Sequence, residues 1–152
     1  MDMHALHIDQ DEFHQLADVV LQEGKGLCFT PRGNSMAPFI ISGDEVYIKR
    51  SKSYRKGDVV LLRNNRVLMI HRIVDKTEGG VITRGDASSS DDPGPVDRAE
   101  ILGKVYRVSG NGYNYHLHPP ISRLLVMPFF SRYLFRNRIV RTVGKIMSPL
   151  LG

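Results

Sequence analysis

The 152-residue sequence predicts a mainly β fold, a small antiparallel β-barrel-like domain with an N-terminal amphipathic helix and a C-terminal basic helical tail. Three observations support this prediction. Apolar residues recur at helical spacing before residue 24, short β-like runs separated by Gly, Pro, Asn and Asp follow, and the last third of the chain contains no acid. We therefore expect a helical segment (1–25), a β domain (26–118) and a tail (119–152), a size that suits a single core.

The first predicted element is an amphipathic helix. Asp9 or Asp11 is its cap, Gly24 follows its end, and its apolar residues are Phe13, Leu16, Ala17, Val20 and Leu21. His4 and His7 precede either cap, which leaves His14 alone on the helix and argues against a metal site. The N-terminus lacks the pattern of a signal peptide, and no run reaches the 18 apolar residues of a spanning helix. The sequence therefore favours a cytoplasmic location or a peripheral one at a membrane surface.

Six β-like runs follow Gly26, at residues 27–30, 45–49, 59–63, 67–75, 80–84 and 101–108. Their separation by turn-forming residues predicts an antiparallel meander with small-barrel character. The turn Arg63-Asn64-Asn65-Arg66 would make a hairpin, because Asn tolerates positive φ values. This hairpin would place His71 opposite the strand that begins at Asp58. The pair His116 and His118 would share one face of a further strand, which we interpret as a surface strand because no third metal ligand is near.

Several of the acidic residues lie in predicted turns and loops. Gly-Asp pairs form turns at strand ends, and we assign this role to Asp44 and Asp58. The polar stretch 86–97 is predicted to be a surface loop, and long loops in compact domains are often functional. Cys28, the single cysteine, lies in an apolar run and is expected to be a buried structural thiol.

The charge of the chain is uneven. All 16 acids precede residue 101 and are accompanied there by 13 Lys and Arg, whereas residues 101–152 hold 8 basic residues and no acid. Residues 121–152 mix apolar and basic side chains, which suits either contact with an anionic membrane surface or an ordinary packing helix with a solvated basic face. Nucleic acid is the less favoured partner, because residues 1–25 contain one helix rather than a helix-turn-helix.

Ser35 is a candidate nucleophile in the segment Gly33-Asn34-Ser35-Met36-Ala37-Pro38. A serine hydroxyl becomes reactive when a nearby base takes its proton. His71 could supply that base from a strand that the pattern predicts to be buried on both faces. The same position also suits an ordinary hydrogen-bonded core histidine, so the residues alone leave both interpretations open.

As an ordered series, the motifs of residues 26–108 resemble the signal peptidase family and the related LexA-type self-cleaving proteins. The series is Gly-Asn-Ser-Met-Ala-Pro at 33–38, Ser-Gly-Asp-Glu-Val at 42–46, Gly-Asp-Val-Val at 57–60, Ile-His-Arg-Ile-Val at 70–74, Thr-Arg-Gly-Asp at 83–86, Asp-Asp at 91–92 and Leu-Gly-Lys-Val at 102–105. Bacterial leader peptidases and LexA-type proteins use a lysine base, whereas endoplasmic-reticulum, archaeal and some Gram-positive signal peptidases use histidine. His71 therefore places the resemblance in the histidine branch.

The resemblance implies a serine endopeptidase with Ser35 as nucleophile, His71 as general base and a loop carboxylate that orients the imidazole. Asp92 falls on the position of the catalytic acid and Asp86 on that of a second acid near the site, so either Asp92 or Asp86 could hold the imidazole. Asp91 is the least favoured of the three. The expected substrate is a peptide or precursor protein bound in extended form, and no cofactor or metal is expected.

Backbone N–H groups would stabilise the oxyanion, with that of Ser35 as the expected first donor and that of Asn34 as a candidate for the second. Gly33 lacks the hydroxyl that some bacterial members carry at this position, so the second donor stays open.

The sequence departs from signal peptidases in one respect. Those enzymes carry a transmembrane helix ahead of the serine, and a short amphipathic helix takes that place here. We therefore expect a peptidase that acts on some other peptide rather than a general secretory enzyme. The alternative is a non-catalytic peptide-binding or regulatory module that keeps the LexA-like or signal-peptidase-like fold.

Overall fold

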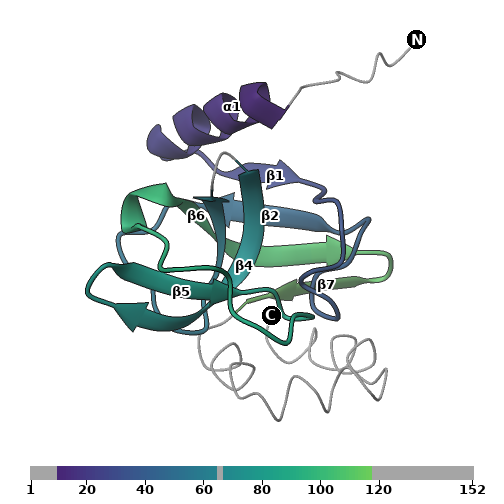
Figure 1. Ribbon diagram of the computed structural model, residues 1–152. Coiled ribbons are helices and arrows are strands. Elements are labelled where there is room, and N and C mark those ends of the chain that lie inside the picture. Colours follow the sequence, from purple (N-terminus) through teal and green to yellow (C-terminus); the bar gives the residue numbers. More distant parts are fainter. Residues whose placement is uncertain (1–9, 65–66, 118–152) are drawn as a thin grey trace.

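One helix and seven strands form the described part of the chain, residues 10–64 and 67–117 of the computed structural model (Figure 1). In chain order they are α1 (Gln10–Gln22), β1 (Leu27–Phe29), β2 (Glu45–Lys49), β3 (Val59–Asn64), β4 (Val67–Thr77), β5 (Gly80–Arg84), a 3-10 turn (Arg98–Glu100), β6 (Ile101–Gly110) and β7 (Tyr113–His116). The mainly β class is confirmed, and every expected strand is present.

The strands form one antiparallel sheet with the order β1-β2-β6-β3-β4-β5, and β7 pairs with β6. The meander prediction is wrong at β6, which lies between β2 and β3. Along one edge β6 pairs with β2, and along the other its first residues pair with β3 and its last with β7. Register shifts on both edges of β6 allow it to pair with three strands, because such irregularities bend a strand.

The sheet is open, so the expected barrel closure is also wrong. Among the described strands none joins β1 to β5, and the outer edge of β5 is instead covered by the loop that follows it, through a bridge between Val81 and Val96. The two paired hydrogen bonds of this bridge measure 2.9 and 2.8 Å. The loop therefore protects an edge that would otherwise present unpaired backbone groups.

The hairpin of β3 and β4 agrees with the sequence prediction. Asn64 pairs with Val67, and Val60 pairs with His71, which places the histidine opposite β3. The two central turn residues, 65–66, lie outside the described part.

Two hydrophobic clusters lie on the two sides of β3. Val59 and Leu61 point into the larger one, which also contains Ala17 and Leu21 of α1, whereas Val60 and Leu62 point into the other. This is the two-residue alternation of a strand buried on both faces. Helix α1 therefore packs on the same core as the sheet. The domain boundary that the sequence predicts after residue 25 stays a prediction.

The β1 strand corrects the expectation for Cys28, which is exposed. Leu27 and Phe29 pack against the larger cluster, so the residue between them points the other way. An apolar run around a cysteine does not determine which face of a short strand it occupies.

Asp44 and Asp58 are turn residues, as expected. Asp44 accepts the Ile41 N–H and Asp58 accepts the Arg55 N–H, each at 2.9 Å, immediately after a glycine with positive φ. Both carboxylates are buried.

The C-terminal predictions fall outside the described residues. These are the basic helical tail (119–152), the membrane contact through residues 121–152 and the position of His118; they stay predictions. In the part of the chain that the structure describes, α1 is too short and too polar to cross a membrane.

Candidate active site

Ser35 lies on a tight turn that follows β1. The turn is closed by backbone hydrogen bonds from Ala37 N–H to Asn34 C=O and from Ile40 N–H to Met36 C=O, both 3.0 Å. Met36 and Ile40 are buried in the larger cluster, whereas Ser35 is exposed. The apolar side chains thus anchor the turn and leave the hydroxyl accessible.

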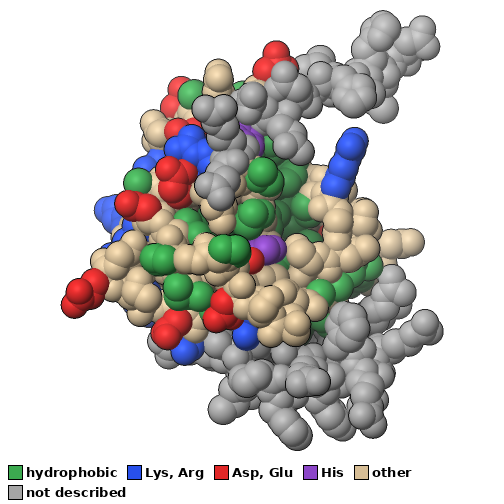
Figure 2. All heavy atoms as spheres, in the orientation of Figure 1, with side chains coloured by type: hydrophobic (Ala, Val, Ile, Leu, Met, Phe, Trp, Pro, Cys, Tyr) green, Lys and Arg blue, Asp and Glu red, His purple; other side chains and the backbone are tan. Residues whose placement is uncertain are grey.

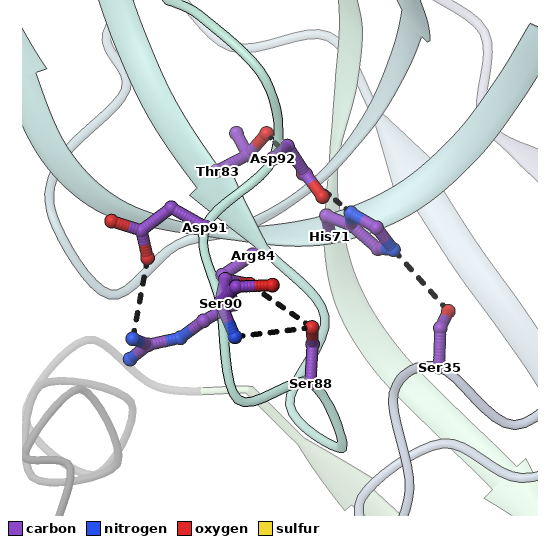
Figure 3. A network of polar contacts seen from close by, with 8 residues as sticks. All are labelled: Ser35, His71, Thr83, Arg84, Ser88, Ser90, Asp91 and Asp92. Carbon is purple, nitrogen blue, oxygen red and sulfur yellow. Dashed lines mark hydrogen bonds and ion pairs between the residues drawn. The ribbon is translucent and has the colours of Figure 1, made fainter.

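His71 brings the serine and an acid together (Figure 3). Its side chain projects from β4 and is 13% exposed. His71 Nδ1 lies 2.6 Å from Asp92 Oδ2, and Nε2 lies 3.3 Å from Ser35 Oγ. With the ring proton on Nδ1 donated to the carboxylate, Nε2 is left as the acceptor for the serine hydroxyl.

Asp92 reaches His71 from the loop after β5, and its side chain is 15% exposed. Its backbone N–H donates to Thr83 C=O at 2.8 Å, and its Oδ2 accepts the Thr83 hydroxyl at 2.6 Å. The same carboxylate oxygen therefore receives both the histidine and the threonine.

Asp86 contacts Arg72 rather than His71. Arg72 Nε and Nη2 donate to its two carboxylate oxygens at 2.7 and 2.6 Å, and Arg72 Nη1 donates to Gly57 C=O at 2.8 Å. The pair is buried and has the fork geometry that makes such contacts strong. Asp91 points away from the histidine and pairs with Arg84 at 3.2 Å (Figure 3).

The family model Peptidase S24-like matches residues 3–106. The chain belongs to this family. The match extends from the N-terminal segment into β6 and includes Ser35, His71 and Asp92. It confirms the expected relationship to the LexA and signal peptidase I-like group. A search of curated proteins finds no match.

In this S24-like domain, Gly85 lets the loop approach the nucleophile. A Cβ at this position would lie 2.6 Å from the Ser35 carbonyl oxygen and 3.2 Å from His71 Nε2. Ala87 N–H donates to the same Ser35 carbonyl at 2.9 Å. The loop that carries Asp92 thus also holds the backbone of Ser35.

The expected oxyanion donors are on the same turn. Within the described residues, the backbone N–H groups of Asn34 and Ser35 have no acceptor in hydrogen-bonding range. The Oδ1 of the Asn34 side chain accepts the Ser42 N–H at 3.1 Å, a bond that holds this side chain toward Ser42. The two backbone N–H groups are the donors that the sequence analysis expects from this turn.

Hydrophobic side chains line part of a hollow on this face of the S24-like domain, with a histidine close to it (Figure 2). Across residues 10–64 and 67–117, no three His, Cys, Asp or Glu side chains gather in a way that could hold a metal ion.

Sequence reasoning did not identify Arg72, Thr83 or Gly85 as parts of the site. Thr83 could have been noticed, because it is a polar residue two positions after Val81 on a strand whose alternate residues are apolar. Arg72 gave a similar signal, because it is a charged residue between Ile70 and Val74 on one face of a strand that the pattern predicts to be buried. Gly85 gave none, since its role depends on contacts between distant segments.

Proposed function

We propose that the chain is a serine endopeptidase that hydrolyses a peptide bond in an extended peptide or precursor protein. The observation that carries the proposal is the continuous series of contacts from Asp92 through His71 to Ser35. The distance of 3.3 Å from Nε2 to Oγ lies near the range for proton transfer, and such contacts commonly tighten when substrate binds. Membership of a peptidase family supports the same conclusion.

In the first half of the reaction, Ser35 Oγ attacks the carbonyl carbon of the scissile bond and His71 Nε2 takes the hydroxyl proton. The negative charge on the substrate oxygen is stabilised by the backbone N–H groups of Ser35 and Asn34. His71 then gives its proton to the leaving amine, which leaves an acyl group on Ser35.

In the second half, His71 takes a proton from water, the hydroxide attacks the acyl group, and the proton returns to Ser35. Asp92 holds the imidazole with its Nδ1 proton facing the carboxylate and stabilises the imidazolium that forms in both halves. Asp86 has a different role, since it holds Arg72, the residue next to the base.

The end strand β1 supports an extended substrate. It leads into the turn that bears Ser35, and of the described strands only β2 pairs with it. A peptide could add to its second edge by main-chain hydrogen bonds, so that side-chain pockets would set the specificity.

Two measurements test the proposal. Wild type should be modified on Ser35 by a fluorophosphonate and should cut members of a peptide library, as detected by mass spectrometry. Ser35→Ala should do neither, whereas Ser42→Ala, which removes an exposed hydroxyl from the same loop, should behave as wild type. If the library is bound but left uncut by wild type, the chain is a peptide-binding module instead. Cuts after small residues would support the narrower, signal-peptidase-like form of the proposal.

A further inference from the structure

Thr83 places a hydroxyl at a fully buried strand position where an apolar β-branched residue would also fit. It is 0% exposed on β5, two residues after the equally buried Val81. A buried hydroxyl is costly unless it is hydrogen-bonded, and valine has almost the same shape without that cost. The hydroxyl finds its acceptor in Asp92 Oδ2 at 2.6 Å. This contact, rather than packing, explains why the position carries threonine.

The backbone of Thr83 holds Asp92 as well. The Asp92 N–H donates to Thr83 C=O at 2.8 Å, and four residues later Val96 is bound to Val81 of the same strand by two hydrogen bonds. Val96 is also buried in the smaller hydrophobic cluster. The segment 92–96 is therefore fixed to β5 at both ends, which fixes the Cα of Asp92 but leaves its carboxylate free to rotate.

The hydroxyl of Thr83 removes that freedom. An ionised carboxylate only accepts hydrogen bonds, so the threonine must be the donor. His71 Nδ1 approaches the same oxygen, at the same distance of 2.6 Å. Two donors on one oxygen determine the plane in which the carboxylate faces the imidazole, whereas either donor alone would permit rotation about the bond to the carboxyl carbon.

We propose that Thr83 is a positioning residue of the site, whose hydroxyl holds Asp92 Oδ2 toward His71 Nδ1. By holding this oxygen, it keeps the imidazole proton on Nδ1 and leaves Nε2 as the acceptor that Ser35 requires. The inference rests on the proposed peptidase function and extends it from three residues to four. A merely structural threonine would affect folding but not the hydrogen bond between Asp92 and His71.

Three variants of the full chain separate these roles. Thr83→Val removes the hydroxyl and keeps the shape of the side chain. Thr83→Ser keeps the hydroxyl but lacks the methyl group, and Thr83→Ala lacks both groups. The first readout is the proton NMR signal of His71 Nδ1–H, which a bond to a carboxylate moves downfield and protects from exchange; His71→Gln assigns it. The second is the rate at which a fluorophosphonate modifies Ser35, and the third is the melting temperature.

We expect Thr83→Val to broaden or abolish the downfield signal and to slow Ser35 modification at least about tenfold. Its melting temperature should stay within about 4 °C of wild type, because an apolar residue replaces a polar one in an apolar environment. Thr83→Ser should recover both the signal and most of the rate despite its smaller side chain, whereas Thr83→Ala should recover neither.

The outcomes distinguish this inference from the proposed function. If Thr83→Val keeps the downfield signal and reacts within twofold of wild type, Thr83 does not position Asp92 and the inference is overturned. If wild-type Ser35 does not react but the signal depends on the threonine hydroxyl, the peptidase proposal fails while the positioning contact stands. Loss of signal and rate in Thr83→Val with recovery in Thr83→Ser supports the inference.

Discussion

At the scale of single residues, Gly85 limits how the loop and the nucleophile can meet. The space that a Cβ would occupy is already taken by the Ser35 carbonyl oxygen at 2.6 Å. This contact is backbone against backbone, so a side chain at position 85 could not be accommodated by a change of rotamer. The hydrogen bond from Ala87 N–H to Ser35 would have to lengthen, and Ser35 would move relative to His71.

We therefore expect Gly85→Ala to slow fluorophosphonate modification of Ser35 about tenfold or more and to lower the free energy of unfolding by about 1–3 kcal/mol. Gly79→Ala is the matched control, because the described residue nearest to a Cβ there is Pro95, whose Cγ would lie at an ordinary 3.8 Å. Labelling kinetics and denaturant unfolding measure the two effects. Equal labelling of the two variants would show that the close approach does not position the serine.

Replacing each of the three loop aspartates by asparagine should affect reactivity and stability differently. Asp92→Asn should slow Ser35 modification about 10³–10⁴-fold, because the amide favours the wrong imidazole tautomer. Asp86→Asn should destabilise the fold by about 3–5 kcal/mol, because it leaves the buried Arg72 guanidinium without its counter-charge.

Asp91→Asn is the control for both effects, because its half-exposed pair with Arg84 should contribute less than about 1 kcal/mol. Labelling rates and urea midpoints of the three variants provide the comparison. If Asp86→Asn were as stable as wild type and as inactive as Asp92→Asn, the roles assigned to these two acids would be reversed.

At the scale of elements, β7 braces the segment that follows Ser35. The Tyr113 hydroxyl donates to Asp44, and the Tyr115 hydroxyl donates to the backbone carbonyl of Phe39. Burial is the main cause that raises the pKa of Tyr115 well above its ordinary value, and the nearby negative charge of Asp44 raises it further. The hydroxyl therefore stays protonated and keeps this bond across the neutral and mildly alkaline range.

The buried hydroxyl of Tyr115 predicts how the free energy of unfolding changes at alkaline pH. The folded-state pKa of Tyr115 lies above the unfolded value near 10, so the folded state retains a proton that the unfolded chain loses. The stabilising contribution is complete below about pH 10 and declines above it by up to about 1.4 kcal/mol per pH unit. Tyr115→Phe should be less stable at pH 8 and show a shallower decline between pH 10 and 11, as measured by urea unfolding. Parallel curves for the two proteins would contradict this account.

The approximate extent of six strands, β1 to β6, could be predicted from the sequence because local signals determine it. Continuous apolar runs such as Val59–Leu62 and glycine-containing turns act over a few residues, and the observed strands follow them. The position of β6 between β2 and β3 could not be predicted, because its pairing depends on register shifts near Ile48 and Leu62 that leave no local pattern.

The site was predictable to a similar degree. Resemblance to a known series of motifs indicated Ser35, His71 and Asp92, and the geometry brings these three together. Resemblance did not separate the partners of Asp86 and Asp92, because both acids lie in one short loop. Only the folded chain directs one toward Arg72 and the other toward His71.

At the scale of the whole molecule, α1 and the sheet share one core. Leu21 is fully buried, and its Cδ1 would lie 3.3 Å from a Cβ placed at Gly103 of β6. The absence of a side chain at position 103 therefore lets the helix lie close to the central strand. This contact indicates that the helix and the sheet should unfold together rather than as separate segments.

Leu21→Ala should therefore destabilise the entire domain, by about 2–5 kcal/mol, because it removes a side chain that the core cannot fully replace. Leu16→Ala is the matched control on the same helix, since Leu16 is 45% exposed and should change stability by less than about 0.5 kcal/mol. Far-ultraviolet circular dichroism reports on secondary structure and tyrosine fluorescence reports on the sheet, so both should show one shared urea transition that moves to lower concentration in Leu21→Ala. Two separate transitions, with only the circular dichroism signal affected, would instead make residues 1–25 an independent segment and place the domain boundary at the end of the helix.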